Sequence, residues 1–357
     1  WSVAKGTSGV RPIVRNNSGT WQYNSALSGW GVSSASYENK SFDVSSQELN
    51  PTGVFFKTDG TKMYIIGYHG DDVNEYNLST AFDVTTATYS QNYLGGHDNA
   101  PQDIFFKPDG TKYYITGSEN ETIYEYTCST AWDISTSSNT ATQGISGRVI
   151  NPSGIFFKPD GTKMYVTGDS QKIVQWNLST AWNPTTLTHA HTHTFANSET
   201  GLPQGLFFKD DGTKVYILGE SPTQKVFEYN LSTAWDLSTI SYSSYSFDVS
   251  SQSPGCKGMT FKPDGSKMYI VGTDNDIVYQ YSTLDYGTSA TWSNGTVNDE
   301  LYTLQQALSV ESNRMDKTQL DAVADANHFS TGTSLDLMIA LRMDTAASTL
   351  PTSDGVT

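Results

Sequence analysis

Residues 55–67 read Phe55-Phe56-Lys57-Thr58-Asp59-Gly60-Thr61-Lys62-Met63-Tyr64-Ile65-Ile66-Gly67, which indicates a short aromatic strand, a tight turn and a second strand. The Asp-Gly pair of the turn returns about every fifty residues, a spacing typical of repeat architectures. Its later copies are Asp109-Gly110, Asp160-Gly161, Asp211-Gly212 and Asp264-Gly265. Each unit of a repeat protein buries its apolar side chains against its neighbours. The chain is therefore predicted to contain five copies of one structural unit.

Each of the first four copies contains the signs of four short strands. A proline begins the unit and stops the preceding strand because it has no N–H to donate, and the Asp-Gly turn then favours a tight hairpin. A third strand such as 226–231 follows, then a turn such as 232–236 (Ser-Thr-Ala-Trp-Asp), and then a weaker strand such as 240–249. We name these strands A to D. Four antiparallel strands per unit predict the blade of a β-propeller.

The fifth repeat contains strands A to C but no strand D. Residues 35–46, which precede the first repeat, copy that missing strand closely. The N-terminal segment is therefore predicted to complete the last blade, which would join the ring and remove two exposed sheet edges. The predicted fold is all-β, a five-bladed propeller of four-stranded blades closed by residues 35–46.

The propeller is expected over residues 34–290, with repeats near 51–100, 101–151, 152–202, 203–253 and 254–290. Residues 1–33 and 291–357 are interpreted as two halves of one host module in which the propeller is inserted, a module expected to continue beyond residue 357. A helix is predicted over about 299–327 and a strand over 334–344. The helix places Leu301, Leu304 and Leu308 at spacings that fit either a coiled-coil seam or packing on the same chain.

Two resemblances extend this interpretation. The line Lys158-Pro159-Asp160-Gly161-Thr162-Lys163-Met164-Tyr165-Val166 resembles the WD40-like and YVTN-type β-propeller repeats. Residues 311–323, together with 334–338, resemble structural proteins of tailed bacteriophages, particularly marine ones, of the tail-fibre or other virion-appendage kind. The second resemblance implies a virion protein that displays its propeller outward, and a homo-oligomer in which a trimer is favoured.

Composition excludes some partners. The chain has 357 residues and a net charge of −16, with 21 Lys and Arg. Nucleic acid is not expected as a partner, because no basic stripe could replace phosphate counterions. No apolar run is long enough to span a bilayer, so membrane insertion is not expected. Cys128 and Cys256 fall in different parts of their repeats, and no disulfide is predicted between them.

Motifs for chemistry are scarce. The sequence has no phosphate-binding loop, no catalytic Ser-His-Asp signature and no paired-cysteine zinc spacing, so neither enzymatic activity nor a cofactor is predicted. His189, His191 and His193 alternate along a predicted outer strand. Alternation would place all three side chains on one face, where they could either hold a metal ion or remain solvated.

The loops between strands B and C, and between D and A, differ among repeats, whereas the A–B and C–D turns are nearly identical. Variable loops on a rigid scaffold often carry recognition. Carboxylates there could bind sugar hydroxyls directly or through Ca²⁺. The predicted binding residues are Asp71, Asp72, His97, Asp98, Glu119, Glu121, Asp169, Glu220, Asp274 and Asp276.

These observations favour a non-enzymatic virion appendage protein, of the tail-fibre, receptor-binding or decoration type. Its expected partner is a host-surface glycan or protein, or another virion protein, and its expected location is the extracellular virion. The alternative is a secreted or cell-surface bacterial propeller adhesin. A propeller lactonase or lyase is a third hypothesis, weakened by inner strands that offer mostly Phe, Ile, Gly and Leu.

Overall fold

A computed structural model describes residues 13–17, 20–24, 29–93, 95, 98–169, 171–196, 198–220, 224–284 and 293–294. The chain divides into two units, one of residues 29–285 and one of residues 1–28 with 286–357. In the latter, β1 (Ile13–Asn17) and β2 (Thr20–Asn24) form an antiparallel hairpin, and β23 (Ser293–Asn294) pairs with β2. One sheet thus joins segments that precede and follow the propeller.

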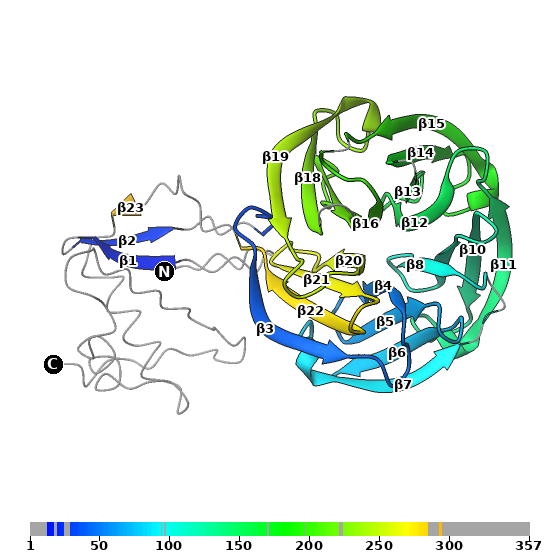
Figure 1. Cartoon of the computed structure of the whole chain (residues 1–357), viewed down its shortest axis with the longest axis horizontal. Coiled ribbons are helices and arrows are strands. Elements are labelled where there is room, and N and C mark those ends of the chain that lie inside the picture. The colour runs from blue at the N-terminus through cyan, green and yellow to red at the C-terminus, as the bar shows by residue number, and fades with distance from the viewer. Residues whose placement is uncertain are drawn as a thin grey trace, which may run out of the picture. The chain divides into compact units, whose positions relative to one another are not determined.

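The unit of residues 29–285 is a five-bladed β-propeller of four-stranded antiparallel blades, which confirms the predicted fold (Figure 1). The first blade is β4 (Pro51–Phe56), β5 (Lys62–Gly67), β6 (Val73–Leu78) and β7 (Ala87–Tyr93). The second is β8 (Pro101–Phe106), β9 (Lys112–Gly117), β10 (Thr122–Cys128) and β11 (Ser137–Gly144). The third is β12 (Ile150–Phe157), β13 (Lys163–Asp169), β14 (Lys172–Leu178) and β15 (Leu187–Thr194).

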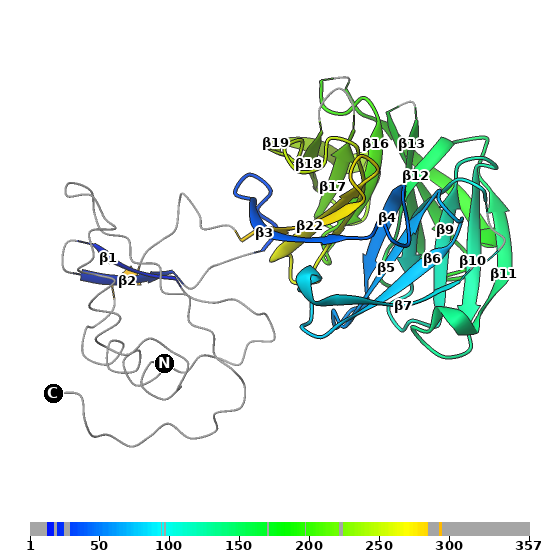
Figure 2. The same ribbon diagram turned by 60° about the horizontal axis from the view of Figure 1, so that its bottom comes forward.

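The fourth blade is β16 (Pro203–Phe208), β17 (Lys214–Gly219), β18 (Lys225–Leu231) and β19 (Ile240–Asp248). The fifth is β20 (Cys256–Phe261), β21 (Lys267–Gly272), β22 (Ile277–Ser282) and β3 (Ser36–Asp43). In the first four blades a short 3₁₀ helix lies in the C–D turn: η1 (Val84–Thr86), η2 (Ile134–Thr136), η3 (Pro184–Thr186) and η4 (Leu237–Thr239). Strands β4, β8, β12, β16 and β20 surround the axis, and β3, β7, β11, β15 and β19 lie outermost (Figures 1 and 2).

The ring closes as predicted, because β3 pairs antiparallel with β22 from Ile277↔Asp43 to Ser282↔Ser36. The borrowed segment supplies more than a strand. Trp30 donates its N–H to the Gly265 carbonyl at 2.7 Å, just as Trp132 binds Gly110 at 3.0 Å in the second blade. Val32, fully buried, takes the place that Ile134 has there. The propeller therefore begins at Gly29 rather than at residue 34, and its fifth blade is interrupted within the C–D turn.

One contact locks each blade to the next, and the turns repeat because of it. Gly161, at φ +72°, lies beneath the Trp182 ring, where any Cβ would overlap the indole. The Trp182 carbonyl accepts a hydrogen bond from the Tyr114 hydroxyl of the preceding blade at 2.7 Å. The same pairing recurs around the whole ring: Tyr64 to Trp132, Tyr165 to Trp235, Tyr216 to Trp30 and Tyr269 to Phe82.

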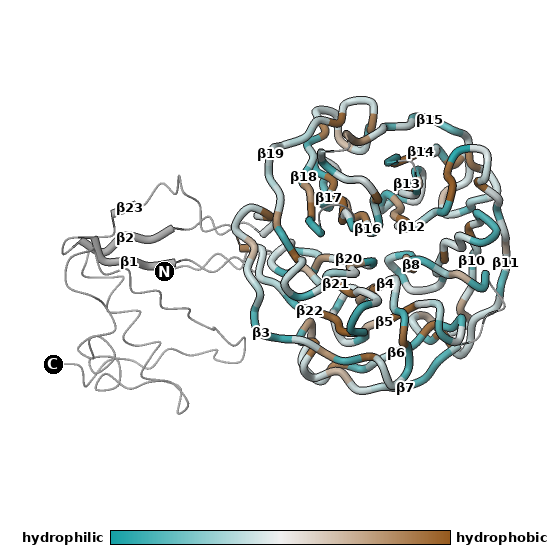
Figure 3. The backbone as a smooth tube through the Cα atoms, in the orientation of Figure 1, coloured by the Kyte–Doolittle hydropathy of each residue, from teal (hydrophilic) through white to brown (hydrophobic). Residues whose placement is uncertain are grey.

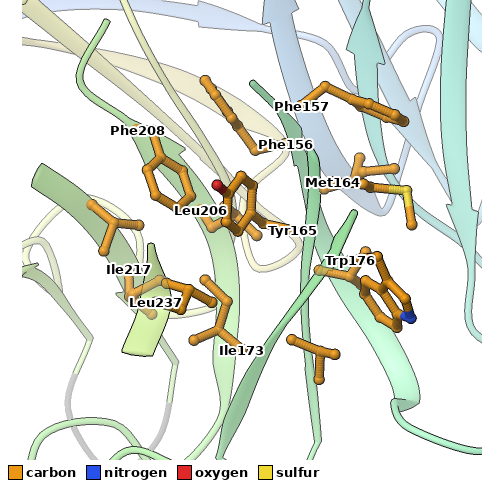
Figure 4. Packing of buried hydrophobic residues seen from close by; sticks show 14 of the residues in the cluster. Phe156, Phe157, Met164, Tyr165, Ile173, Trp176, Leu206, Phe208, Ile217 and Leu237 are labelled. Carbon is orange, nitrogen blue, oxygen red and sulfur yellow. The ribbon is translucent and has the colours of Figure 1, made fainter. Parts of the chain in front are cut away.

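Apolar side chains fill the space between blades. Between the third and fourth blades, the Tyr165 ring lies 4.3 Å from that of Phe208 and is surrounded by buried aliphatic side chains (Figure 4). Along the chain, apolar residues concentrate on the inner strands and polar ones on the outermost strands (Figure 3). This distribution is expected of packed blades whose outermost strands face solvent. Cys128 and Cys256 are both buried free thiols.

Several predictions concern residues outside those that the structure describes. These are the helix over about 299–327, its Leu301, Leu304 and Leu308, and the strand over 334–344. The trimer therefore stays a prediction. None of the helices within the described ranges has the length and apolar character that a membrane span requires.

Candidate functional site

The B–C and D–A loops of all five blades lie at one end of the propeller, which we call the variable-loop face. Its described residues are 68–72, 118–121, 171, 220, 224 and 273–276 in the B–C loops, and 44–50, 95, 98–100, 145–149, 195–196, 198–202 and 249–255 in the D–A loops. The A–B and C–D turns lie at the opposite end, which we call the repeat-turn face. The two described ends of the propeller, Gly29 and Leu284, both lie in the C–D turn of the fifth blade.

Each D–A loop lies beneath the B–C loop of the blade that follows it and supports that loop. Asp98 is 1% exposed, and its carboxylate accepts the backbone N–H groups of Ala100, Glu119 and Asn120 at 2.8–3.1 Å. Glu48 does the same for Asn50 and His69, each at 2.8 Å. The predicted binding residue Asp98 is therefore a buried support of a loop. His97 lies outside the described residues.

Asp72 also has a structural role, because it binds strands of its own blade. It is 5% exposed and accepts hydrogen bonds from the side-chain amides of Asn74 at 2.6 Å and Asn92 at 2.5 Å. Asp71 and Asp276, at φ 52° and 56°, occupy the left-handed positions of their B–C turns, a conformation that Asp and Asn tolerate well. Part of the acidic character of these loops therefore comes from turn geometry.

The remaining predicted residues are reachable by solvent. Glu119 and Asp274 are exposed, and Glu119 accepts a hydrogen bond from Asn99 at 2.7 Å. Glu121, at φ 48°, Asp169 and Glu220 are half-buried. These five side chains lie in or next to the B–C loops of four different blades, so they are spread around the variable-loop face and do not form one compact site.

A group of carboxylates whose charges affect one another's pKa lies where the fifth, first and second blades meet. We call it the acid arc, and it consists of Glu48, Asp71, Asp72, Asp98, Glu119 and Asp276. Burial raises the pKa of Asp71, and the charges of Asp72, Asp98 and Glu119 raise it further. Burial likewise raises the pKa of Glu48 to about 7, with smaller contributions from Asp72 and Asp276. Five of its six residues, all except Glu48, are predicted binding residues.

The mouth of the central channel has a second polar group that the sequence analysis did not identify. Lys257 donates to Glu220 at 2.6 Å, and Gln204 donates to the same carboxylate oxygen at 2.8 Å. On the other side, Gln102 donates to the Tyr68 hydroxyl at 2.5 Å and to Ser118 at 2.8 Å. One sequence pattern could have revealed this ring: the residue before Gly53, Asp103, Gly154, Gly205 and Gly258 on the inner strands is always polar, as Thr52, Gln102, Ser153, Gln204 and Lys257.

Exposed apolar side chains also gather on this face. Among the described residues, four of the six large hydrophobic side chains that are most exposed belong to its loops or their first strand residues: Leu49 at 45%, Tyr68 at 37%, Ile150 at 52% and Leu202 at 36%. Such side chains next to polar groups are characteristic of interaction surfaces.

The axis itself is nearly closed. Phe55, Phe105, Phe156 and Phe207 contact one another edge to face around it, with centroids 5.0–5.5 Å apart. They leave a cavity of ≈ 10 Å³, which has room for about one water molecule. A substrate could not enter this cavity.

One acid lies beside the closed axis. Asp103 is 6% exposed and stands where the other inner strands have glycine, at Gly53, Gly154, Gly205 and Gly258. Its two oxygens accept the N–H groups of Ile104 at 2.9 Å and Ile155 at 3.0 Å, the latter from the next blade. Burial raises the pKa of Asp103 to about 8.

The three histidines lie on β15 but do not converge. A bulge pairs Gln175 with His191 and Trp176 with His189, which disturbs the alternation expected from the sequence. His193 packs against the rings of Phe195 and Tyr229. Within the described ranges, no three His, Cys, Asp or Glu side chains approach closely enough to hold a metal ion.

No protein-family model matches the chain, and no curated protein sequence is similar to it. Several solved structures are similar to part of the chain. A functionally unknown protein from Desulfotomaculum acetoxidans is 17% identical, with a TM-score of 0.43 over 74% of this chain and 90% of that one. The periplasmic gluconolactonase of Pseudomonas aeruginosa is 13% identical, with a TM-score of 0.41 over 65% of this chain and 66% of that one. A Bacteroides uniformis protein provisionally named a 6-phosphogluconolactonase is also 13% identical, with a TM-score of 0.43 over 68% of each chain.

These comparisons correct one prediction. The sequence predicts no enzymatic activity and keeps a propeller lactonase or lyase only as a third hypothesis, yet solved structures similar to this chain include proteins named as lactonases. That prediction is withdrawn, because one fold can host enzymes and binding proteins alike and the absence of a familiar motif does not separate them. At 13% identity the similarity concerns the fold and assigns no activity to this chain.

Proposed function

We propose that the chain is a virion appendage protein whose propeller recognises a partner through its variable-loop face. The partner is either a component of the host surface or another virion protein. The observation that supports this most is the contrast between the two ends of one ring. At one end every turn is explained by contacts between blades, and at the other end acidic, aromatic and apolar side chains reach solvent without such an explanation.

The chain path supports the same proposal. Both connections of the propeller leave through the C–D turn of the fifth blade, so the polypeptide enters and exits by the repeat-turn face. A propeller inserted in this way leaves all of its B–C and D–A loops uninterrupted. The resemblance of residues 311–323 and 334–338 to tailed-phage structural proteins supports the virion context. The secreted or cell-surface adhesin is the alternative, and it would use the same face.

Binding assays on glycan and peptide arrays test the recognition surface. Leu49, Ile150 and Leu202, all exposed on the variable-loop face, would be changed together to Ser. Any ligand found for the parent chain should bind at least tenfold more weakly to this variant. Tyr245, equally exposed but on the outer strand β19, provides the control as Tyr245→Ser. The proposal would be contradicted by a ligand that binds the triple variant as tightly as the parent chain but binds Tyr245→Ser more weakly.

The virion context has a separate test. Sequencing the genome around the gene should reveal neighbouring capsid, baseplate or tail genes, and mass spectrometry of purified particles should detect the chain. A gene set without virion components, encoding instead a secretion system or cell-wall anchoring proteins, would replace the virion by the adhesin while leaving the recognition face in place.

A further inference from the structure

One corner of the variable-loop face, where the first and second blades meet, presents an exposed aromatic ring among polar groups. The Tyr68 side chain is 37% exposed, and its hydroxyl accepts a hydrogen bond from the side-chain amide of Gln102. The same amide donates to Ser118 at 2.8 Å, and the next residue, Glu119, accepts a hydrogen bond from Asn99 at 2.7 Å. We call these five residues the Tyr68 corner. Hydrogen bonds thus tie the ring of Tyr68 in the first blade to side chains of the second.

The loops that carry this corner are held from beneath. Buried Asp98 accepts the N–H group of Glu119 at 3.1 Å, and buried Glu48 accepts that of His69, the residue after Tyr68, at 2.8 Å. The backbone on both sides of the corner is therefore fixed before any ligand arrives. A ligand that binds here does not have to order the loops first, which removes one of the usual costs of binding.

The packing of the blades does not account for an aromatic residue at this position. Tyr68 begins its B–C loop and directly follows Gly67. The residues that follow the corresponding glycine in the other blades are Ser118, Asp169, Glu220 and Thr273. Tyr64, by contrast, recurs as a tyrosine in every blade because the contact between blades uses its hydroxyl. Tyr68 does not recur, so its ring serves a purpose outside the repeated scaffold.

Hydrogen-bonding capacity remains free around the ring. The Oε1 atom of Gln102 accepts no hydrogen bond from the described residues, and in the same ranges only the Oε2 atom of Glu119 has a partner. The Tyr68 hydroxyl accepts from Gln102 and keeps its own hydrogen to donate. The corner therefore offers two acceptors and a donor beside the face of an aromatic ring.

This combination suits a sugar. The C–H groups on one face of a sugar ring carry partial positive charge, and the face of an aromatic ring is negative. Each sugar hydroxyl can both donate and accept, and a hydrogen bond to a carboxylate is stronger than one between neutral groups. A protein partner would be expected to meet a mainly apolar surface at the centre of its interface. The exposed residues that flank Tyr68 and Glu119 are instead His69, Gly70, Asn99 and Asn120.

We propose that the Tyr68 corner binds a neutral or amino sugar of an oligosaccharide, with the sugar ring stacked on Tyr68 and its hydroxyls bound by Glu119 and Gln102. This inference rests on the proposed function, because the corner belongs to the variable-loop face, and it names the partner's class: a host-surface glycan and not a virion protein. The Glu119 carboxylate and the net charge of −16 disfavour acidic sugars. Leu49 lies nearby, since the carbonyl of the next residue, Asn50, accepts the Tyr68 N–H at 3.2 Å. The triple serine variant described above should therefore also weaken this ligand.

Three substitutions test the stacking and the charge separately. Tyr68→Leu keeps an apolar side chain but removes the planar ring, and Tyr68→Phe keeps the ring but loses the hydrogen bond with Gln102. Glu119→Gln keeps an oxygen that accepts the Asn99 bond but removes the charge. Both positions are exposed, so each variant should leave the melting temperature nearly unchanged.

Two matched controls lie away from the corner. Tyr245→Leu removes an equally accessible aromatic ring from the outer strand β19, where Tyr245 is 52% exposed. Asp236→Asn removes one charge from the repeat-turn face, where Asn183 already performs the same role in the third blade. Both controls should keep the fold and leave the corner intact.

The probes are an array of neutral and amino-sugar oligosaccharides, a second array of acidic oligosaccharides of the same lengths, and calorimetry with the oligosaccharide that binds best. The full chain should bind the first array and not the second. Tyr68→Leu and Glu119→Gln should bind at least about tenfold more weakly, Tyr68→Phe within about threefold and both controls within about twofold of the parent. A peptide partner would contact Leu as well as Phe, so the difference between the two Tyr68 variants is specific to stacking.

Other outcomes overturn the proposal. An oligosaccharide that binds Tyr68→Leu and Glu119→Gln as tightly as the parent, yet binds the triple serine variant more weakly, would place the ligand elsewhere on the same face. Preference for the acidic array, an equal loss with Tyr245→Leu, or binding to peptides alone would likewise contradict the corner while leaving the proposed function to its own test. The absence of any ligand on the glycan and peptide arrays would contradict both.

Discussion

The two ends of the propeller differ in what fixes their sequence. On the repeat-turn face, glycine, tryptophan and tyrosine form the same lock between neighbouring blades around the ring, as in Gly161, Trp182 and Tyr114. On the variable-loop face the residue that supports the B–C loop differs between blades: it is Asp98 in the second blade and Val149 in the third. Internal repetition therefore marks the residues that hold the ring together. Internal variation marks the residues that the ring leaves free for another purpose.

The strongest test of this comparison removes one part of the lock altogether. Deleting residues 1–46 takes away β3, Trp30 and Val32, so the fifth blade loses its outer strand and Tyr216 loses its acceptor. We expect the truncated chain to lose its cooperative thermal transition and to aggregate through the exposed edge of β22. Circular dichroism and size-exclusion chromatography would measure both effects. Deleting only residues 1–28 spares the blade and should preserve the transition; equal behaviour of the two truncations would refute this closure.

The next effect compares one glycine from each face. Gly161→Ala places a methyl group in the Trp182 ring at a φ of +72°, whereas nothing lies within 4 Å of a Cβ added at Gly147 in a D–A loop. The left-handed conformation alone costs an alanine about 1–2 kcal/mol, and displacement of the indole adds to that. Gly161→Ala should therefore lower the melting temperature by roughly 5–10 °C. Gly147→Ala should leave it unchanged, and similar shifts for both would show that the lock is unimportant.

The sequence predicted the lock better than the face. The Asp-Gly period and the copied strand at 35–46 reveal local patterns that recur, and both proved correct. The role of Trp30 was not predicted, because the turn that it completes follows β22 in space, whereas Trp30 itself lies about 250 residues earlier in the sequence. Only the position of Val32 and Trp30 relative to β3 shows that they replace a turn from another part of the chain.

The candidate site was harder to predict for a physical reason. A carboxylate in a polar loop can either bind the backbone of that loop or face solvent, and composition is the same in both cases. Asp72 and Asp98 are buried because they accept hydrogen bonds from neighbouring side-chain amides and backbone N–H groups, whereas Glu119 and Asp274 are exposed. Lys257 and Gln204 were missed because one polar residue in an apolar strand suggests only its own solvation.

A smaller effect should appear in the pH dependence of stability. The pKa of Asp103 is raised to about 8 and that of Glu48 to about 7. Each carboxyl holds its proton more tightly when folded, so each lowers stability as pH rises from its ordinary value to its folded one. Asp103→Asn should flatten the fall in melting temperature between pH 7 and pH 8.5, by on the order of a few degrees. Glu48→Gln should flatten the fall in melting temperature only below pH 7, where the carboxyl of Glu48 loses its proton. An unchanged pH profile of the melting temperature in both variants would contradict these burial effects.

The smallest expected effect separates the faces most directly. Glu119 and Asp274 are exposed on B–C loops, so Glu119→Gln with Asp274→Asn should change the melting temperature by less than about 1 °C, as most surface substitutions do. On the repeat-turn face, Asp160 accepts the Thr162 N–H and hydroxyl at 3.0 and 2.6 Å, and losing these bonds in Asp160→Ala should cost about 1 kcal/mol, or roughly 2–4 °C. Both measurements need only a calorimeter and the full chain. If the loop variant proved the less stable of the two, the exposed acids would also belong to the scaffold, and variation among the repeats would no longer indicate a surface kept for binding.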